Sequence, residues 1–253
     1  MKKLVTFIIS VLIISCGDNE QKVFIEDLNC SISNDKYVNF KIGDEVVCWT
    51  ESNPIRIDNL GSGDCGLGYE NIKTPYLSTG IRGYLCKPSS DNCLTVDRSI
   101  IFHFTHSCSS YDTQDKFYNL IQPGDYELAT STTDFGKFFI EYYENDVWYN
   151  SKVGNQKDSK VVVLEVKRIA PTSFTSPDGS INGTTAGLEV TLKASFNLYN
   201  ADGQFFKRVS GATVKGIMYR PTPFGILWDD YYGELFKRAT TKCFCNGAVT
   251  SWF

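Results

Sequence analysis

The sequence predicts a mainly β protein, an antiparallel β-sandwich of the immunoglobulin-like type with a cysteine-rich N-terminal half and one or two short helices. Three observations favour this fold class. Apolar and polar residues alternate over 188–199, as in a strand with one buried face. Clusters of Gly, Pro, Asn and Asp separate several segments of this kind. Nine cysteines follow the N-terminal apolar run, and eight of them lie beyond Cys16, an even number that suits disulfide bonds.

The composition is that of a folded globular protein. The chain has 253 residues, of which 42% are hydrophobic and 21% are charged. Its formal net charge is −4. A nucleic-acid-binding protein needs a basic surface, so we expect no nucleic-acid partner.

The N-terminus has the pattern of a secretory signal peptide, which we place at residues 1–15. Lys2 and Lys3 give a positive start, and residues 4–14 are apolar except for one Thr and one Ser. This run of 11 residues is too short for a transmembrane helix, which needs roughly 20.

The end of the apolar run, Ile13-Ile14-Ser15-Cys16, resembles the lipobox of bacterial lipoproteins. The resemblance implies cleavage before Cys16, attachment of acyl chains such as palmitate to Cys16, and a lipid anchor in the outer membrane, at the cell surface or on the periplasmic face. The alternative is an ordinary signal peptide in which this cysteine is incidental. Residues 16–27 then form the lipidated cysteine and a polar tether, in which Asp18 and Glu20 are similar to the acidic residues that follow the anchor in Bacteroidota-type surface lipoproteins.

The other cysteines are Cys30, Cys48, Cys65, Cys86, Cys93, Cys108, Cys243 and Cys245. In an exported protein they are expected to form disulfides. The turn-rich segment between Cys86 and Cys93 makes this pair the first prediction. Cys243 and Cys245 cannot pair comfortably with each other, so at least one should bond to the first 110 residues and tie the C-terminal segment back.

Zinc binding is the alternative use of these cysteines, together with His103 and His106. We expect no metal site, because the chain contains no C-x₂-C pair. If residues 100–106 form a strand, the two histidines point to opposite faces, since they are three residues apart.

We divide the mature chain into a cysteine-rich β region at 28–125 and a β-sandwich region at 126–253. In the first region, strands are expected at 37–42, 46–51 and 99–105, and a short helix at 111–121. Gly- and Cys-rich loops are expected between them.

The second region shows stronger strand signals, and a second short helix is expected at 231–240. A long loop is expected at 171–187, which is rich in Ser, Thr and Gly. The apolar segment 161–169 predicts a strand covered on both faces. The other expected strands are 126–129, 137–143, 147–150, 188–199, 204–209 and 212–220, with Ser210-Gly211 separating the last two.

Residues 137–220 resemble the β-sandwich portion of uncharacterised Bacteroidota-type lipoproteins. The segments that carry the resemblance are 138–151, 195–203 and 209–216. It implies a sandwich fold and a location in the cell envelope, and it implies no activity.

Motifs for catalysis or cofactor binding are weak. Residues 61–66 match G-x-G-x-x-G without the strand and helix that a nucleotide site needs. Asp58, Asn59, Ser62 and Asp64 do not have the spacing of a calcium loop. A Ser-His-Asp hydrolase would have to place one of the two histidines beside a serine that the sequence does not identify. A glycosidase needs only two carboxylates, and the sequence neither favours nor excludes Glu141 or Glu165 for this role. We expect no enzymatic activity and no cofactor.

The segment most like a ligand-binding surface consists of Trp228, Asp229, Asp230, Tyr231 and Tyr232. Aromatic rings stack on sugars and carboxylates accept hydrogen bonds from hydroxyl groups. The alternative is that these rings fill the edge of the sandwich.

The predicted function is a membrane-anchored envelope lipoprotein with a binding, structural or adhesive role, and with the membrane and a glycan or protein ligand as its partners. One alternative is a glycosidase-type hydrolase acting on an envelope polymer. Another is a periplasmic accessory factor for assembly or transport.

Overall fold

The structure of the protein is a computed structural model that describes residues 28–30, 36–52, 54–63, 76–88, 93, 95–107, 113–175 and 182–220. Several predicted features lie outside these residues: the signal peptide and Cys16, the cysteines Cys65, Cys108, Cys243 and Cys245, the segment 228–232 and the helix at 231–240. In the described part of the chain, no helix has the length and apolar character needed to cross a lipid bilayer.

The described residues form strands and one short helix. In chain order they are β1 (Tyr37–Ile42), β2 (Glu45–Thr50), β3 (Ile55–Gly63), β4 (Tyr76–Cys86), β5 (Val96–Ser107), α1 (Gln114–Tyr118), β6 (Gly124–Tyr126), β7 (Phe138–Glu144), β8 (Val147–Asn150), β9 (Lys160–Thr175), β10 (Asn182–Tyr199) and β11 (Phe205–Tyr219).

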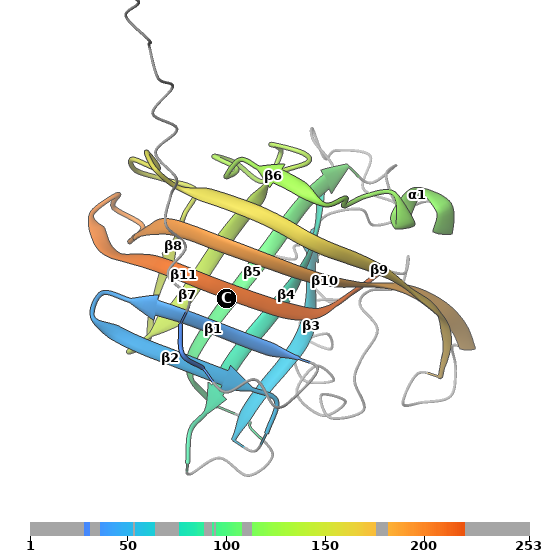
Figure 1. Cartoon of the computed structure of the whole chain (residues 1–253), viewed down its shortest axis with the longest axis horizontal. Helices are drawn as coiled ribbons and strands as arrows, with labels where there is room; N and C mark the ends of the chain where they lie inside the picture. Colours follow the sequence, from blue (N-terminus) through green and yellow to red (C-terminus); the bar gives the residue numbers. More distant parts are fainter. Residues whose placement is uncertain are drawn as a thin grey trace, which may run out of the picture.

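These strands form one antiparallel sheet with the order β2-β1-β11-β10-β8-β7-β5-β4-β3. Off this path, β9 pairs with β10, and β6 pairs with β9. The first strand therefore pairs with the last, and Tyr37 lies opposite Lys215. In Figure 1, the strands β1, β11, β10 and β9 lie in front. They cross β4, β5 and β7, which lie behind them, at a steep angle.

The sheet is curled into a nearly closed, barrel-like shape. Its two terminal strands, β2 and β3, are consecutive in the chain and separated only by residues 51–54, which brings both ends of the sheet together. The backbone N–H of Tyr219 in β11 donates to Oδ1 of Asn59 in β3, at 3.0 Å. The approach of β11 to β4 is so close that a Cβ on Gly216 would lie 2.6 Å from Ile81.

The predicted mainly β, antiparallel fold with a short helix is confirmed, but the two separate sheets of a sandwich are replaced by one continuous sheet. The physical reason is that the long strands bend. Between β10 and β11 the register shifts at Ser195, and Gly211 has the positive φ of +59° that suits a β-bulge. One bent sheet can then cover both sides of the core.

The core fills the inside of the curled sheet with aliphatic and aromatic side chains. Phe40, Phe102 and Tyr142 are fully buried, and they come from β1, β5 and β7. Phe102 meets Phe196 of β10 edge to face, with ring centroids 6.0 Å apart. The core therefore joins residues from both predicted regions.

Several strands differ from the predictions. β9 and β10 extend into 171–187, so most of the predicted loop is strand. β9 is not covered on both faces, because Val161 and Val163 are buried while Leu164 is 48% exposed. β11 continues through Ser210-Gly211 as a bulged strand. β3 and β4 replace predicted loops, while α1 lies inside the predicted helix and begins after the N-cap Thr113.

Two disulfide bonds join cysteines in the described part of the chain. The predicted bond between Cys86 and Cys93 is confirmed, and it closes the turn between β4 and β5. The second bond joins Cys30 to Cys48 in β2. The expected partners of Cys243 and Cys245 stay predictions.

Candidate functional site

The richest set of chemically active side chains lies on the outside of the sheet, over four neighbouring strands. We call this set the outer polar face. It consists of Ser78 and Arg82 of β4, Ser99 and His103 of β5, Phe139, Glu141 and Tyr143 of β7, Trp148 and Asn150 of β8, and Lys152 just after β8.

Strand alternation explains why these side chains point outward. In β5, Ile100, Phe102 and Phe104 belong to the inner core, so Ser99, His103 and Thr105 point to the other face. Both faces of β5 are nevertheless buried from Ser99 to His106. The outer polar face is therefore deeply buried at β4 and β5 and opens to solvent at β7 and β8, where Tyr143, Trp148 and Asn150 are partly exposed.

His103 is the centre of this set. Its Nδ1 lies 3.2 Å from the hydroxyl oxygen of Ser78, and its Nε2 lies 3.3 Å from Oε2 of Glu141. The second contact has the distance of an ion pair but not the angles of a hydrogen bond. The imidazole stacks on the ring of Phe139 with centroids 4.3 Å apart and planes 10° apart. Three strands thus hold His103 in one orientation.

Glu141 is an ionised carboxylate. Burial raises the pKa of this carboxyl, but its contacts with His103 and Lys152 have a larger effect in the opposite direction. The pKa is therefore lowered, to about 2. The Nζ atom of Lys152 lies 3.3 Å from Oε1 of Glu141 and 4.4 Å from the centroid of the Phe139 ring. A carboxyl with so low a pKa cannot serve as the general acid of a glycosidase, which needs a raised pKa.

No motif in the sequence indicates that Ser78 lies beside a histidine. Serine, histidine and carboxylate are the three side-chain types of a nucleophilic hydrolase. Here Ser78 is 0% exposed and His103 is 2% exposed, so in this structure a substrate does not contact the serine. Only the register between β4, β5 and β7 could have revealed this arrangement.

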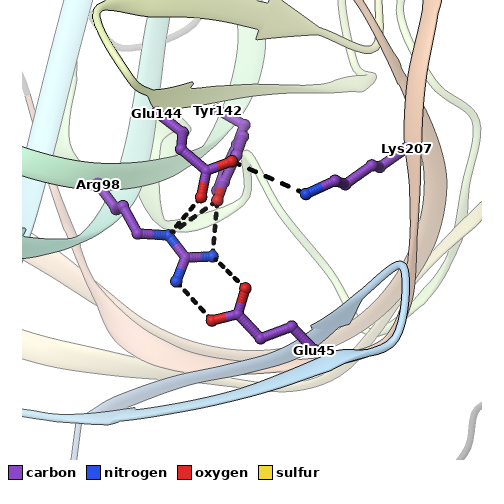
Figure 2. Close-up of polar contacts among 5 residues, drawn as sticks. All are labelled: Glu45, Arg98, Tyr142, Glu144 and Lys207. Carbon is purple, nitrogen blue, oxygen red and sulfur yellow. Dashed lines mark hydrogen bonds and ion pairs between the residues drawn. The ribbon is translucent and has the colours of Figure 1, made fainter.

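A second polar cluster closes one end of the barrel (Figure 2). The two terminal nitrogens of Arg98 donate to the carboxylate of Glu45 at 2.6 and 3.1 Å, and its Nε lies 3.0 Å from Glu144. Arg98 also donates to the hydroxyl of Tyr142, and Lys207 lies 3.9 Å from Glu144. The cluster therefore links the β1–β2 hairpin to β5, β7 and β11 (Figure 2).

The electrostatics of this cluster are those of a satisfied ion-pair network. The hydrogen bond from Arg98 lowers the pKa of Glu45. Burial raises the pKa of Tyr142 above its ordinary value, so the phenol stays protonated. Burial lowers the pKa of Arg98, but its bonds to Glu45 and Tyr142 outweigh burial and raise it. Because carboxylates already surround Arg98, we interpret the cluster as a structural closure.

The described residues contain no group of three or more His, Cys, Asp or Glu side chains placed to hold a metal ion. β5 is a strand, so the prediction that His103 and His106 point to opposite faces is confirmed. Of the weak calcium-loop candidates, Asn59 is engaged with Tyr219, and Asp64 lies outside the described residues.

Comparisons of the chain with protein-family models, curated proteins and solved structures found no match.

Proposed function

We propose that the protein is a lipid-anchored cell-envelope protein with a binding, structural or adhesive role. The observation that carries this proposal is Cys16, which stands directly after an apolar, apolar, small sequence at the end of the signal-peptide run. Acyl chains on this cysteine would hold the folded domain at the outer membrane.

The disulfide bonds support export. Cys30–Cys48 and Cys86–Cys93 are both within the described residues, and such bonds persist in oxidising compartments outside the cytoplasm. A cytoplasmic location would expose the same cysteines to reducing conditions.

The anchor can be tested by metabolic labelling with a clickable palmitate analogue. We expect the wild-type chain to take up the label, Cys16→Ser to lose it, and the control Ser15→Ala, which keeps a small residue before the cysteine, to retain it. Labelling of Cys16→Ser, or none of the wild type, would overturn the lipid anchor.

The membrane face can be tested by protease treatment of intact and permeabilised cells that carry a C-terminal tag. Loss of the tag in intact cells would support display at the surface and an adhesive or binding role. Protection until permeabilisation would favour the periplasmic accessory role, which depends on a protein partner.

Hydrolysis of an envelope polymer is the second candidate, and the contact between Ser78 and His103 is the observation that favours it. A fluorophosphonate probe, which labels activated serines, tests this candidate directly. Labelling of the wild type that disappears in Ser78→Ala would support a hydrolase. The complete burial of Ser78 leads us to expect no labelling.

A further inference from the structure

The exposed end of the outer polar face carries a pair of aromatic rings. Tyr143 of β7 and Trp148 of β8 lie directly opposite each other in the sheet register, and both are partly exposed. Their ring centroids are 5.0 Å apart, with planes tilted by 41°. The neighbouring pair, Tyr142 and Tyr149, contributes to the core instead. The hairpin therefore leaves the rings of Tyr143 and Trp148 partly exposed.

Hydrogen-bonding groups surround these two rings. The hydroxyl of Tyr143 donates to Oδ1 of Asp146 in the hairpin turn, at 2.6 Å. Glu141 and Asn150 form the next cross-strand pair on the same face, about 7 Å along the strands. The side chains of Glu141 and Lys152 are 22% and 23% exposed, so solvent reaches both charges.

This combination of groups fits a carbohydrate better than a protein. The outward positions of β7 and β8 contain Phe139, Glu141, Tyr143, Trp148 and Asn150, so aromatic and polar side chains are present and aliphatic ones are not. Sugar rings offer apolar C–H faces that stack on aromatic rings, and hydroxyl groups that bond to carboxylates, amides and ammonium groups. A protein hot spot is also rich in Trp and Tyr, but it lies in a well-packed and fully desolvated pocket, whereas Glu141 and Lys152 stay in contact with solvent here.

We propose that Tyr143 and Trp148 form a carbohydrate-binding platform, with Glu141, Asn150 and Lys152 as hydrogen-bonding partners for sugar hydroxyls. This inference rests on the proposed binding function and names the ligand class and the site. The neighbouring His103 and Phe139 support the platform from the buried side, because His103 contacts Glu141 and Phe139 contacts Lys152.

The test is affinity electrophoresis of the full-length lipoprotein in detergent, through native gels that contain laminarin, xylan or hydroxyethylcellulose. We expect at least one polysaccharide to retard the wild type, and Tyr143→Ala/Trp148→Ala to weaken that retardation by about tenfold or more. Tyr143→Phe keeps the ring and should retain binding. If the double variant does not fold, the single variants Tyr143→Ala and Trp148→Ala are measured in its place.

Two control variants separate this site from others. Phe205→Ala removes an aromatic ring that is 59% exposed on the β10–β11 hairpin, and it should leave binding unchanged. Trp228→Ala tests the segment predicted from the sequence, and it should also leave binding unchanged.

The platform is wrong if none of the three polysaccharides retards the wild type, if the folded double variant binds as well as the wild type, or if Trp228→Ala alone abolishes binding. Crosslinking from a photoreactive residue at position 148 to a protein would also overturn it. Palmitate labelling of the same preparation reports on the lipid anchor independently, so failure of the platform can be distinguished from failure of the proposed function.

Discussion

His103 and Glu141 meet across the boundary between β5 and β7, with Nε2 of the imidazole 3.3 Å from Oε2 of the carboxylate. The register places His103 opposite Phe139. Glu141 is two residues further along β7, so its side chain lies on the same face of the sheet. Lys152 contacts the other carboxylate oxygen. A buried histidine, a carboxylate and a lysine therefore depend on one another, and the acid stability of the protein should depend on them.

Glu141→Gln is expected to make the unfolding free energy depend less on pH in the acid range. The folded state lowers the pKa of Glu141 from 4.5 to about 2 through its contacts with His103 and Lys152, which outweigh burial. Its stabilising contribution is therefore complete above pH 4.5 and is lost as the pH falls towards 2. We expect the variant to lose about 2–3 kcal/mol of unfolding free energy at pH 7.

Urea unfolding at pH values between 7 and 3 measures this effect. The control is Glu165→Gln, which makes the same chemical change at a β9 side chain that is 52% exposed, and which should shift stability by less than about 0.5 kcal/mol. Equal effects of the two variants would contradict the role of the His103–Glu141 contact.

His106 should make the protein sensitive to acid in a higher pH range. Burial lowers the pKa of His106 from 6.5 to about 4. The unfolded chain takes up a proton below pH 6.5 and the folded chain does not, so stability falls as the pH is lowered from 6.5 towards 4. His106→Gln should flatten this part of the stability curve, and Glu141→Gln should not. A curve that keeps its slope in the folded His106→Gln variant would show that another group titrates.

The Arg98 cluster predicts unequal costs for its two ends. Arg98→Met leaves the largely buried Glu144 and the hydroxyl of Tyr142 without their main partner, and should cost about 2–4 kcal/mol. Glu45→Gln changes a side chain that is 51% exposed, and should cost less than about 1 kcal/mol. Denaturant unfolding of both variants at neutral pH measures the difference. A larger cost for Glu45→Gln would mean that the cluster depends on the β1–β2 hairpin.

Gly216 tests the closure of the barrel. A Cβ at this position would lie 2.6 Å from Cγ2 of Ile81, so Gly216→Ala should force β11 away from β4 and cost about 1–3 kcal/mol. The same change in an Ile81→Ala background should cost much less, because the clashing methyl group is gone. A double-mutant cycle measured by thermal unfolding gives the coupling. Additive costs would show that the two strands are not in contact.

The sequence predicted those strands that have turn residues at their ends or a clear alternation of apolar and polar residues. β1 and β8 match their predicted ranges, because each lies beside a turn that marks its end. The buried residues of β10 from Leu188 to Leu198 are the apolar members of the predicted alternation, with the addition of Ser195 at the register shift. β3 and β4 were missed because Gly61, Gly63, Gly80 and Gly83 are typical of loops. In the folded sheet, Gly83 instead leaves room for Val38 of β1.

The outer polar face could not be predicted for a different reason. Ser78, His103 and Glu141 are 25 and 38 residues apart in the chain, and only the pairing of β4 with β5 and of β5 with β7 brings them together. A shift of one residue in either register would turn one partner to the opposite face. The single sheet was equally hidden, since alternation shows that a strand has a buried face and does not show which strands share that core.

The pairing of β1 with β11 sets an order for folding. Tyr37 finds its partner only when Lys215 is present, so the β1–β2 hairpin cannot join the sheet until nearly all of the described chain has been made. Until then β1 has an unpaired edge, which can pair with another chain. Closing so long a loop is slow, because the chain loses conformational entropy before the β1–β11 contacts that offset this loss can form. A chain cut before residue 205 would lack β11, and its two N-terminal strands would have no sheet to join.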